Sequence, residues 1–215
     1  LDVARKQLVM NGKNMLSNAL ELARWARSEI NHIDGLYAFG KEISASPGCY
    51  EFDETKLGVH VTSLGRSGYS MESLLRKEYN IQIELSDLYN ILSIVTIGDR
   101  YQDLLALVNA LRDISERSVV KEYRRISELP ETPKMIVLPR DAFYSPKRVI
   151  MLECSEGEIS GETIMAYPPG IPVICIGERI TKDIIDYIKI LKEERCELQG
   201  ALDPGTDFIR VLGVD

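Results

Sequence analysis

The segment Leu57-Gly58-Val59-His60-Val61-Thr62 alternates apolar side chains with small or polar ones. An alternation of this kind predicts a half-buried β-strand. The residues that follow, Leu64-Gly65-Arg66-Ser67-Gly68, have the composition of a turn. We expect a helix after this turn that runs to about Tyr79, with Ser67 or Ser70 as its N-cap. This part of the sequence therefore predicts a strand that leads directly into a helix.

Further strands and a second helix are expected downstream. Ile81–Leu85 again alternates, and Ile91–Ile97 is mostly apolar, as expected for a buried central strand. Gly98 and Asp99 end this strand, and Asp99 is expected to cap the next helix. The apolar stripe of that helix consists of Leu104, Leu105, Val108, Leu111 and Ile114. The order β-α-β-β-α predicts an α+β fold in which helices cover a small sheet.

Upstream of this module, the first thirty residues are predicted to form one amphipathic helix. Apolar residues recur at steps of three and four, namely at Leu16, Ala19, Leu20, Ala23, Ala26 and Ile30. A long amphipathic helix requires a surface that covers its apolar stripe. That surface is expected either in the rest of this chain or in something outside it.

Downstream, the polar and proline-bearing stretch 129–133 predicts a domain boundary. A second small α/β domain is expected at 131–215. Its strand-like runs are Met135–Leu138, Val149–Leu152, Val173–Ile176 and Phe208–Leu212. A helix from Thr181 to about Glu194 is expected among them.

Composition excludes several classes of function. The formal net charge is −7 and no stretch concentrates Lys and Arg, so we expect no nucleic-acid surface. No run approaches the roughly 20 apolar residues of a membrane span. The four cysteines lie far apart and only two histidines are present, which predicts no metal site and reduced thiols in a cytoplasmic protein. Both histidines, His32 and His60, are expected at exposed, non-catalytic positions.

The densest motif is Tyr167-Pro168-Pro169-Gly170-Ile171-Pro172. Its three prolines fix the backbone φ angle and remove three N–H donors, which excludes a helix or a central strand. A stiff segment of this kind suits the wall of a substrate pocket, because it loses little entropy on ordering. The alternative from composition alone is a proline-rich loop that joins two strands.

The sequence resembles the ornithine/lysine/arginine decarboxylases, which are fold-type-I pyridoxal-phosphate enzymes, in the short form similar to arginine decarboxylase. The blocks that carry the resemblance, in the order of the family, are Asp53–Leu57, Leu64–Tyr69, Leu74–Gln82, Glu84–Asp87, Ile97–Asp99, Pro139–Phe143, and Tyr167–Pro172 with Gly177-Glu178. The resemblance implies that the chain holds only the small and C-terminal domains of such an enzyme. The expected organisation is a helical segment at 1–46 that links to a large domain, a small domain at 47–130 and a C-terminal domain at 131–215.

The resemblance also implies where the cofactor lies. The family holds pyridoxal phosphate through a lysine that directly follows a histidine, whereas the pairs here are His32-Ile33 and His60-Val61. We therefore expect no catalytic and no cofactor-binding residue in this chain. The implied partners are a large cofactor-binding domain of the same protein and a second copy in a homodimer or higher homo-oligomer.

The expected contribution of the chain is one wall of the substrate site. The implied substrates carry a cation at the end of the side chain, for which a buried carboxylate is the natural partner. The predicted wall residues are Glu162, Tyr167, Pro168, Pro169, Gly170 and Glu178. The alternative for each acid is a surface or capping carboxylate, and for Tyr167 a core aromatic.

The predicted function is thus the C-terminal portion of a decarboxylase of a basic amino acid, arginine first and lysine or ornithine next, which yields an amine of the polyamine pathway and CO₂. The chain alone is expected to be inactive. The alternative from a different class is a stand-alone, non-enzymatic α+β module for ligand binding or oligomerisation.

Overall fold

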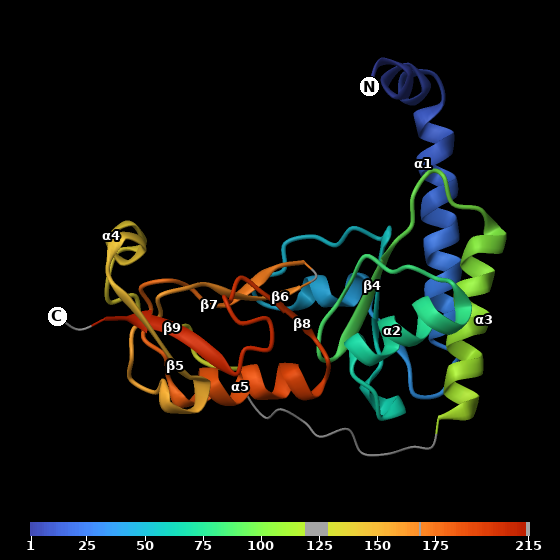
Figure 1. Ribbon diagram of the computed structural model, residues 1–215. Coiled ribbons are helices and arrows are strands. Elements are labelled where there is room, and N and C mark those ends of the chain that lie inside the picture. The colour runs from blue at the N-terminus through green and yellow to red at the C-terminus, as the bar shows by residue number, and fades with distance from the viewer. Residues whose placement is uncertain (119–128, 168, 214–215) are drawn as a thin grey trace. The chain divides into compact units, whose positions relative to one another are not determined.

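The computed structural model describes residues 1–118, 129–167 and 169–213, and the chain divides into two compact units, Leu1–Arg124 and Arg125–Asp215 (Figure 1). Both units mix helices with antiparallel strands, which confirms the predicted α+β fold class. Each unit has its own sheets and its own buried apolar residues, so each is described by itself.

The first unit is built on a four-stranded antiparallel sheet with strand order β1-β2-β4-β3. Its elements in chain order are α1 (Asp2–Ile30), β1 (Tyr37–Ala38), the 3-10 helix Lys41–Ala45, β2 (Lys56–His60), the 3-10 helix Thr62–Leu64, α2 (Gly68–Tyr79), β3 (Leu85–Ser86), β4 (Asn90–Ile94) and α3 (Tyr101–Arg117). The strand predicted first is the central β2, which pairs with β4 along its whole length. Within it, Gly58 leaves room for the Phe39 ring, since a Cβ at this position would lie 2.2 Å from Phe39 Cζ.

The helices of this unit bury their predicted stripes in one core. Ala23, Ala26 and Ile30 of α1 are buried in the same cluster as Leu104 and five further residues of α3. In Figure 1, α1 and α3 run side by side, while the N-terminal half of α1 extends beyond α3 and the sheet. Leu16 is 51% exposed, so this unit covers only part of the apolar stripe expected on the helix.

One local prediction is confirmed and two are wrong. Ser67 is the N-cap of α2, because its side chain accepts a hydrogen bond from Ser70 N at 3.2 Å. The strand expected at Ile81–Leu85 is reduced to β3, since Ile81 N donates back to Leu75 O and thereby closes α2. Asp99 does not cap α3. It accepts from Thr96 N and Oγ1, whereas the Asp103 carboxylate accepts from Arg100 N at the start of the helix.

The second unit contains a two-stranded sheet, β5-β9, and a three-stranded sheet of order β7-β6-β8. Its elements are α4 (Pro139–Tyr144), β5 (Lys147–Met151), the 3-10 helix Leu152–Cys154, β6 (Ile164–Tyr167), β7 (Ile171–Ile174), α5 (Lys182–Glu193), β8 (Glu197–Gln199) and β9 (Phe208–Leu212). Thr181 caps α5 by accepting from Ile184 N, and the helix buries four apolar residues. The predicted strand at Met135–Leu138 is wrong except for one isolated bridge between Met135 and Glu178.

Much of the second unit is held by backbone hydrogen bonds between loops and strand edges. The segment 157–161 alone donates to Ile180 O, Glu178 O and Arg210 O, at 2.8 to 2.9 Å. Gly177 adopts a positive φ of 89°, and a Cβ there would meet Val137 O at 2.2 Å, so only glycine fits this turn. The loop at 175–178 is thereby fixed against the segment that carries Glu162.

Across the described residues, no helix combines the length and the apolar character that crossing a bilayer requires. Within the same residues, no group of three or more His, Cys, Asp or Glu side chains is arranged to hold a metal ion. None of the four cysteines, all of which lie among the described residues, forms a disulfide bond.

Candidate functional site

The motif at 167–172 forms the turn and the two arms of a β-hairpin. Strand β6 ends at Tyr167, β7 begins at Ile171, and Ala166 lies opposite Ile171 in the register. Gly170 has a φ of 106° and its N–H donates to Ala166 O at 3.0 Å, which closes the turn. Pro168 lies outside the described residues. The local structure therefore matches the loop that joins two strands.

Pro169 and Pro172 lie at positions that tolerate the loss of a backbone N–H donor. Strand β7 forms an edge of its three-stranded sheet, so Pro172 removes no hydrogen bond that a neighbouring strand needs. The tip of the hairpin is solvent-accessible: Tyr167 is 43% exposed and Pro169 is also exposed. Tyr167 is not a core aromatic, and its ring is free to contact a molecule outside this unit.

Glu162 is buried, and its carboxylate binds groups of its own unit. Oε1 accepts from Arg210 N at 2.9 Å, and Oε2 accepts from Leu202 N at 3.0 Å and from Arg210 Nε at 2.8 Å. The side chain is only 2% exposed. Charge-assisted hydrogen bonds of this kind are among the strong ones in proteins. The carboxylate thus ties the 202 loop and β9 to the segment before β6.

Glu178 also serves its own turn. Its Oε2 accepts from Cys175 N at 2.7 Å, while its backbone O accepts from Ser160 N at 2.8 Å. Burial, and next the charge of Glu178, raise the pKa of the Cys175 thiol, so this cysteine stays protonated. The side chain of Glu178 therefore caps the loop 175–178.

The predicted wall residues fall into two groups. Ser160 joins the two acids, because its N–H donates to Glu178 O and its hydroxyl donates to Glu162 O at 2.6 Å. Tyr167 lies five residues beyond Glu162, about 16 Å along an extended strand. The structure brings Glu162 and Glu178 together at the base of the hairpin and leaves Tyr167, Pro169 and Gly170 at its tip.

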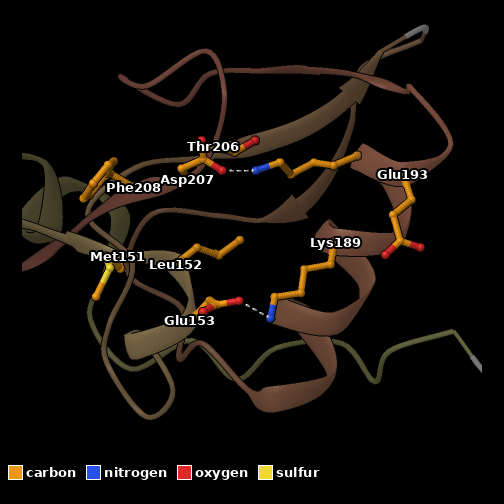
Figure 2. Close-up of a pocket in the computed structure, with 9 residues that line it drawn as sticks. Met151, Leu152, Glu153, Lys189, Glu193, Thr206, Asp207 and Phe208 are labelled. Atoms are coloured by element: carbon orange, nitrogen blue, oxygen red, sulfur yellow. Dashed lines mark hydrogen bonds and ion pairs between the residues drawn. The ribbon is translucent and has the colours of Figure 1, made fainter.

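A cavity of about 410 Å³ lies in the same unit between α5 and the β5-β9 sheet. Its lining consists of Met151, Leu152, Glu153, Lys189, Lys192, Glu193, Thr206, Asp207 and Phe208. Two ion pairs cross from α5 to the opposite side, Lys189 to Glu153 at 2.7 Å and Lys192 to Asp207 at 2.6 Å (Figure 2). No contiguous pattern of residues indicated this cavity, because its charged residues come from three separate segments.

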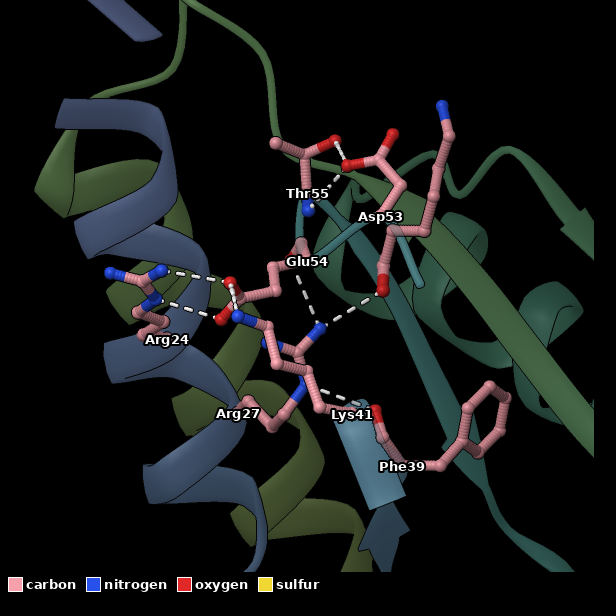
Figure 3. Close-up of polar contacts among 8 residues, drawn as sticks. Arg24, Arg27, Phe39, Lys41, Asp53, Glu54 and Thr55 are labelled. Atoms are coloured by element: carbon pink, nitrogen blue, oxygen red, sulfur yellow. Dashed lines mark hydrogen bonds and ion pairs between the residues drawn. The ribbon is translucent and has the colours of Figure 1, made fainter. Parts of the chain in front are cut away.

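The first unit holds a polar network that the sequence did not predict either (Figure 3). Arg27 of α1 donates to three backbone carbonyls, Phe39 O at 2.9 Å and both Glu54 O and Lys56 O at 3.0 Å. Arg24 forms a two-point pair with the Glu54 carboxylate at 2.7 and 2.8 Å, and Lys41 approaches it at 2.8 Å. These hydrogen bonds and charges lower the pKa of Glu54 to about 2.

The two histidines have structural partners. His32 is exposed and its Nδ1 lies 2.7 Å from Ser28 O. His60 is half-buried rather than exposed as predicted. Its ring nitrogens contact Asn90 Oδ1 at 3.2 Å and Thr62 Oγ1 at 2.7 Å. Both contacts are explained by the strand and turn that surround the ring.

Solved structures share this fold. A constitutive lysine decarboxylase of Escherichia coli superposes with a TM-score of 0.68 at 17% identity, covering 94% of this chain and 41% of its own. A lysine decarboxylase of Francisella novicida gives 0.66 at 19% identity, with 94% and 40% covered. The chain therefore has the fold of part of a lysine decarboxylase.

Sequence comparison places the chain more closely. Residues 123–201 match the family model for the Orn/Lys/Arg decarboxylase C-terminal domain. An arginine decarboxylase of Bacillus subtilis is 43% identical over 99% of this chain and 44% of its own length, and one of Bacillus anthracis is 42% identical over the same shares. The chain belongs to the Orn/Lys/Arg decarboxylase family. It spans less than half the length of these curated relatives.

Proposed function

We propose that the protein containing this chain is a pyridoxal-phosphate-dependent decarboxylase of a basic amino acid, with arginine as the substrate and lysine or ornithine as alternatives. This proposal rests mainly on the 43% identity to an arginine decarboxylase along 99% of the chain. The product would be an amine of the polyamine pathway together with CO₂. We further propose a cytoplasmic homodimer or higher homo-oligomer, in which a large domain binds the cofactor.

The cavity lysines of the second unit do not suit a covalent link to the cofactor. A lysine that forms a Schiff base must react as a neutral amine. The two lysines that line the cavity of the second unit, Lys189 and Lys192, each form an ion pair with a carboxylate. Neither histidine is followed by a lysine. We therefore assign pyridoxal phosphate to the part of the relatives' length that this chain does not span.

The proposed role of the chain is a rigid border of the substrate site. The exposed tip of the hairpin is formed by Tyr167, Pro169 and Gly170. We propose that this tip faces the bound substrate. Support comes from the exposure of Tyr167 on an otherwise paired strand and from the fixed turn behind it. Glu162 and Glu178 are proposed as positioning residues, because their carboxylates already accept hydrogen bonds from this unit.

The activity is tested with the natural protein that contains this chain, supplied with pyridoxal phosphate. We expect CO₂ release from arginine, and a kcat/KM for lysine and ornithine lower by about tenfold or more, which corresponds to about 1.4 kcal/mol of transition-state stabilisation. Release of CO₂ from each amino acid, labelled at C1, gives the rates. If none of the three amino acids yields CO₂ above the cofactor-only blank, the proposed function is wrong.

The border is tested with Tyr167→Ala in the same protein. Removal of the ring is expected to lower kcat/KM for the preferred substrate by about tenfold, because the reacting groups lose one fixed neighbour. The stability of the unit should change little, since the side chain is half exposed. Tyr144→Ala is the matched control, because Tyr144 is 79% exposed on α4. If the two variants had the same kcat/KM, Tyr167 would not form part of the border.

A further inference from the structure

The cavity between α5 and the β5-β9 sheet has an apolar surface flanked by charge. Met151 and Phe208 are opposite each other in the β5-β9 register, are about half exposed and line the cavity together with the buried Leu152. Its volume of about 410 Å³ falls in the range of roughly 300–1,000 Å³ that is typical of small-molecule sites. An occupant would therefore need an aliphatic part that covers these side chains.

The charges of the lining favour a cation. Two lysines against three carboxylates leave one net negative charge. Lys189 and Lys192 pair with Glu153 and Asp207 across the cavity, so neither is available to Glu193. Among the described residues, Glu193 forms no ion pair, although it lies on the same helix as both lysines (Figure 2). The unneutralised group of the cavity is thus a carboxylate.

Thr206 adds a polar group that points to a ligand. The residue is 1% exposed and lines the cavity, and its hydroxyl has no hydrogen-bond partner among the described residues. Within those residues no fully buried side-chain polar atom lacks a partner, so this hydroxyl must open onto the cavity rather than into the core. Its φ of 50° is rare for a β-branched residue, and strained backbone is often found where a ligand binds.

The Thr206 conformation is imposed by a preorganised loop. Asp203 accepts from Gly205 N at 3.1 Å, Asp207 N at 2.9 Å and Phe208 N at 3.0 Å. The hydrogen bonds from Phe208 and Gly205 contribute most to lowering the pKa of Asp203, so the loop is held by a carboxylate. Two residues that line the cavity, Asp207 and Phe208, are therefore in place before any ligand arrives.

We propose that this cavity is a binding site for an aliphatic amine cation. The alkyl chain lies against Met151, Leu152 and Phe208, and the ammonium group pairs with Glu193 and reaches the Thr206 hydroxyl. One such cation neutralises the net negative charge of the lining and also gives the Thr206 hydroxyl a hydrogen-bond partner. The site is separate from the hairpin tip, and its binding can be measured without any decarboxylase activity.

The test is a titration of the 215-residue chain, labelled with ¹³C at the methionine methyl groups, with n-pentylamine. We expect a saturable shift of the Met151 resonance, which Met151→Leu assigns. Pentan-1-ol and pentanoate, which keep the chain but lack the cation, are expected to bind at least about tenfold more weakly. An equal response to pentanoate, or no shift with pentylamine, would overturn the proposal.

Variants assign the binding to the cavity. Glu193→Gln is expected to raise the Kd for pentylamine about tenfold, whereas Glu194→Gln removes the same charge from a neighbouring residue outside the lining and should leave the Kd unchanged. Thr206→Val keeps the shape of the side chain without its hydroxyl and is expected to weaken binding about threefold. Equal losses from Glu193→Gln and Glu194→Gln would indicate general charge attraction and contradict the assigned site. None of these outcomes bears on CO₂ release, so this proposal and the proposed function stand or fall separately.

Discussion

Arg27 in the first unit and Glu162 in the second both bind backbone polar groups of neighbouring segments, but with opposite charges. Arg27 is a half-buried cation that donates to three backbone carbonyls, and Glu162 is a buried anion that accepts from two backbone N–H groups and one guanidinium. Each ties loops to a strand or a helix that the apolar core alone would not fix. In both units one charged side chain organises several backbone groups, and the burial of that side chain sets how much stability depends on it.

The largest effect is expected from Glu162→Gln. The amide places an N–H group where the carboxylate accepted hydrogen bonds, and it leaves Arg210 without its counter-charge. Breaking a buried charged pair typically costs about 3 kcal/mol. Hydrogen exchange of the amides at 199–212 measures this loss, and the fluorescence of Trp25, which lies in the first unit, should not change.

Glu158→Gln is the matched control for this variant. Glu158 pairs with Arg148 at 2.7 Å, but the pair lies at the surface with side chains 30% and 43% exposed. Surface pairs contribute little. If Glu158→Gln destabilises the second unit as much as Glu162→Gln does, the buried carboxylate has no special role.

A smaller loss, about 2 kcal/mol, is expected from Arg27→Met. Methionine keeps most of the apolar stem of arginine, so the loss reports mainly the hydrogen bonds to the three carbonyls, which water can partly replace. Urea unfolding followed by Trp25 fluorescence measures it. Arg24→Met, one turn earlier, removes only contacts with Glu54 and should cost much less. If Arg24→Met lost as much stability as Arg27→Met, the hydrogen bonds from Arg27 to the three carbonyls would have no special role.

The smallest effect is expected from Glu54→Gln, and it should depend on pH. Because the folded protein holds the pKa of Glu54 at about 2, below its ordinary value near 4.5, the charged form stabilises the fold above pH 4.5 and this contribution disappears as the pH falls toward 2. The partner cations Arg24 and Lys41 are well exposed, so we expect about 1 kcal/mol or less at pH 7.

Urea midpoints of the parent and Glu54→Gln at pH 7, 4.5 and 3 give the measurement. The difference between them should narrow between pH 4.5 and 3, and it should shrink at pH 7 when salt is added. A difference that stays constant with pH would show that the variant acts through lost packing and not through the charge.

The regular elements could be predicted because their patterns are local. The alternation at 57–61 and the stripe from Leu104 to Ile114 each depend on residues within one element, and both formed as expected. The alternation at Ile81–Leu85 misled because the apolar side chains Ile81 and Ile83 pack into the core from a segment that closes α2. Apolar alternation reports burial, and a strand also needs a partner for its backbone.

The candidate site was less predictable for the same reason. The motif at 167–172 is contiguous, so its turn and its exclusion from a central strand followed from proline and glycine chemistry. The partners of Glu162 lie 40 and 48 residues away, at Leu202 and Arg210. No short sequence pattern indicates partners at such a distance. The cavity between α5 and the β5-β9 sheet likewise draws on three distant segments.

The edge position of β7 has a consequence for how copies of this protein meet one another. An open strand edge offers unpaired N–H and C=O groups that can pair with a strand of another molecule and start aggregation. Pro172 has no N–H to offer, and it stands opposite Met165 in the short edge strand. The proline that stiffens the hairpin thereby also makes its outer edge a poor template for growth into a larger intermolecular sheet.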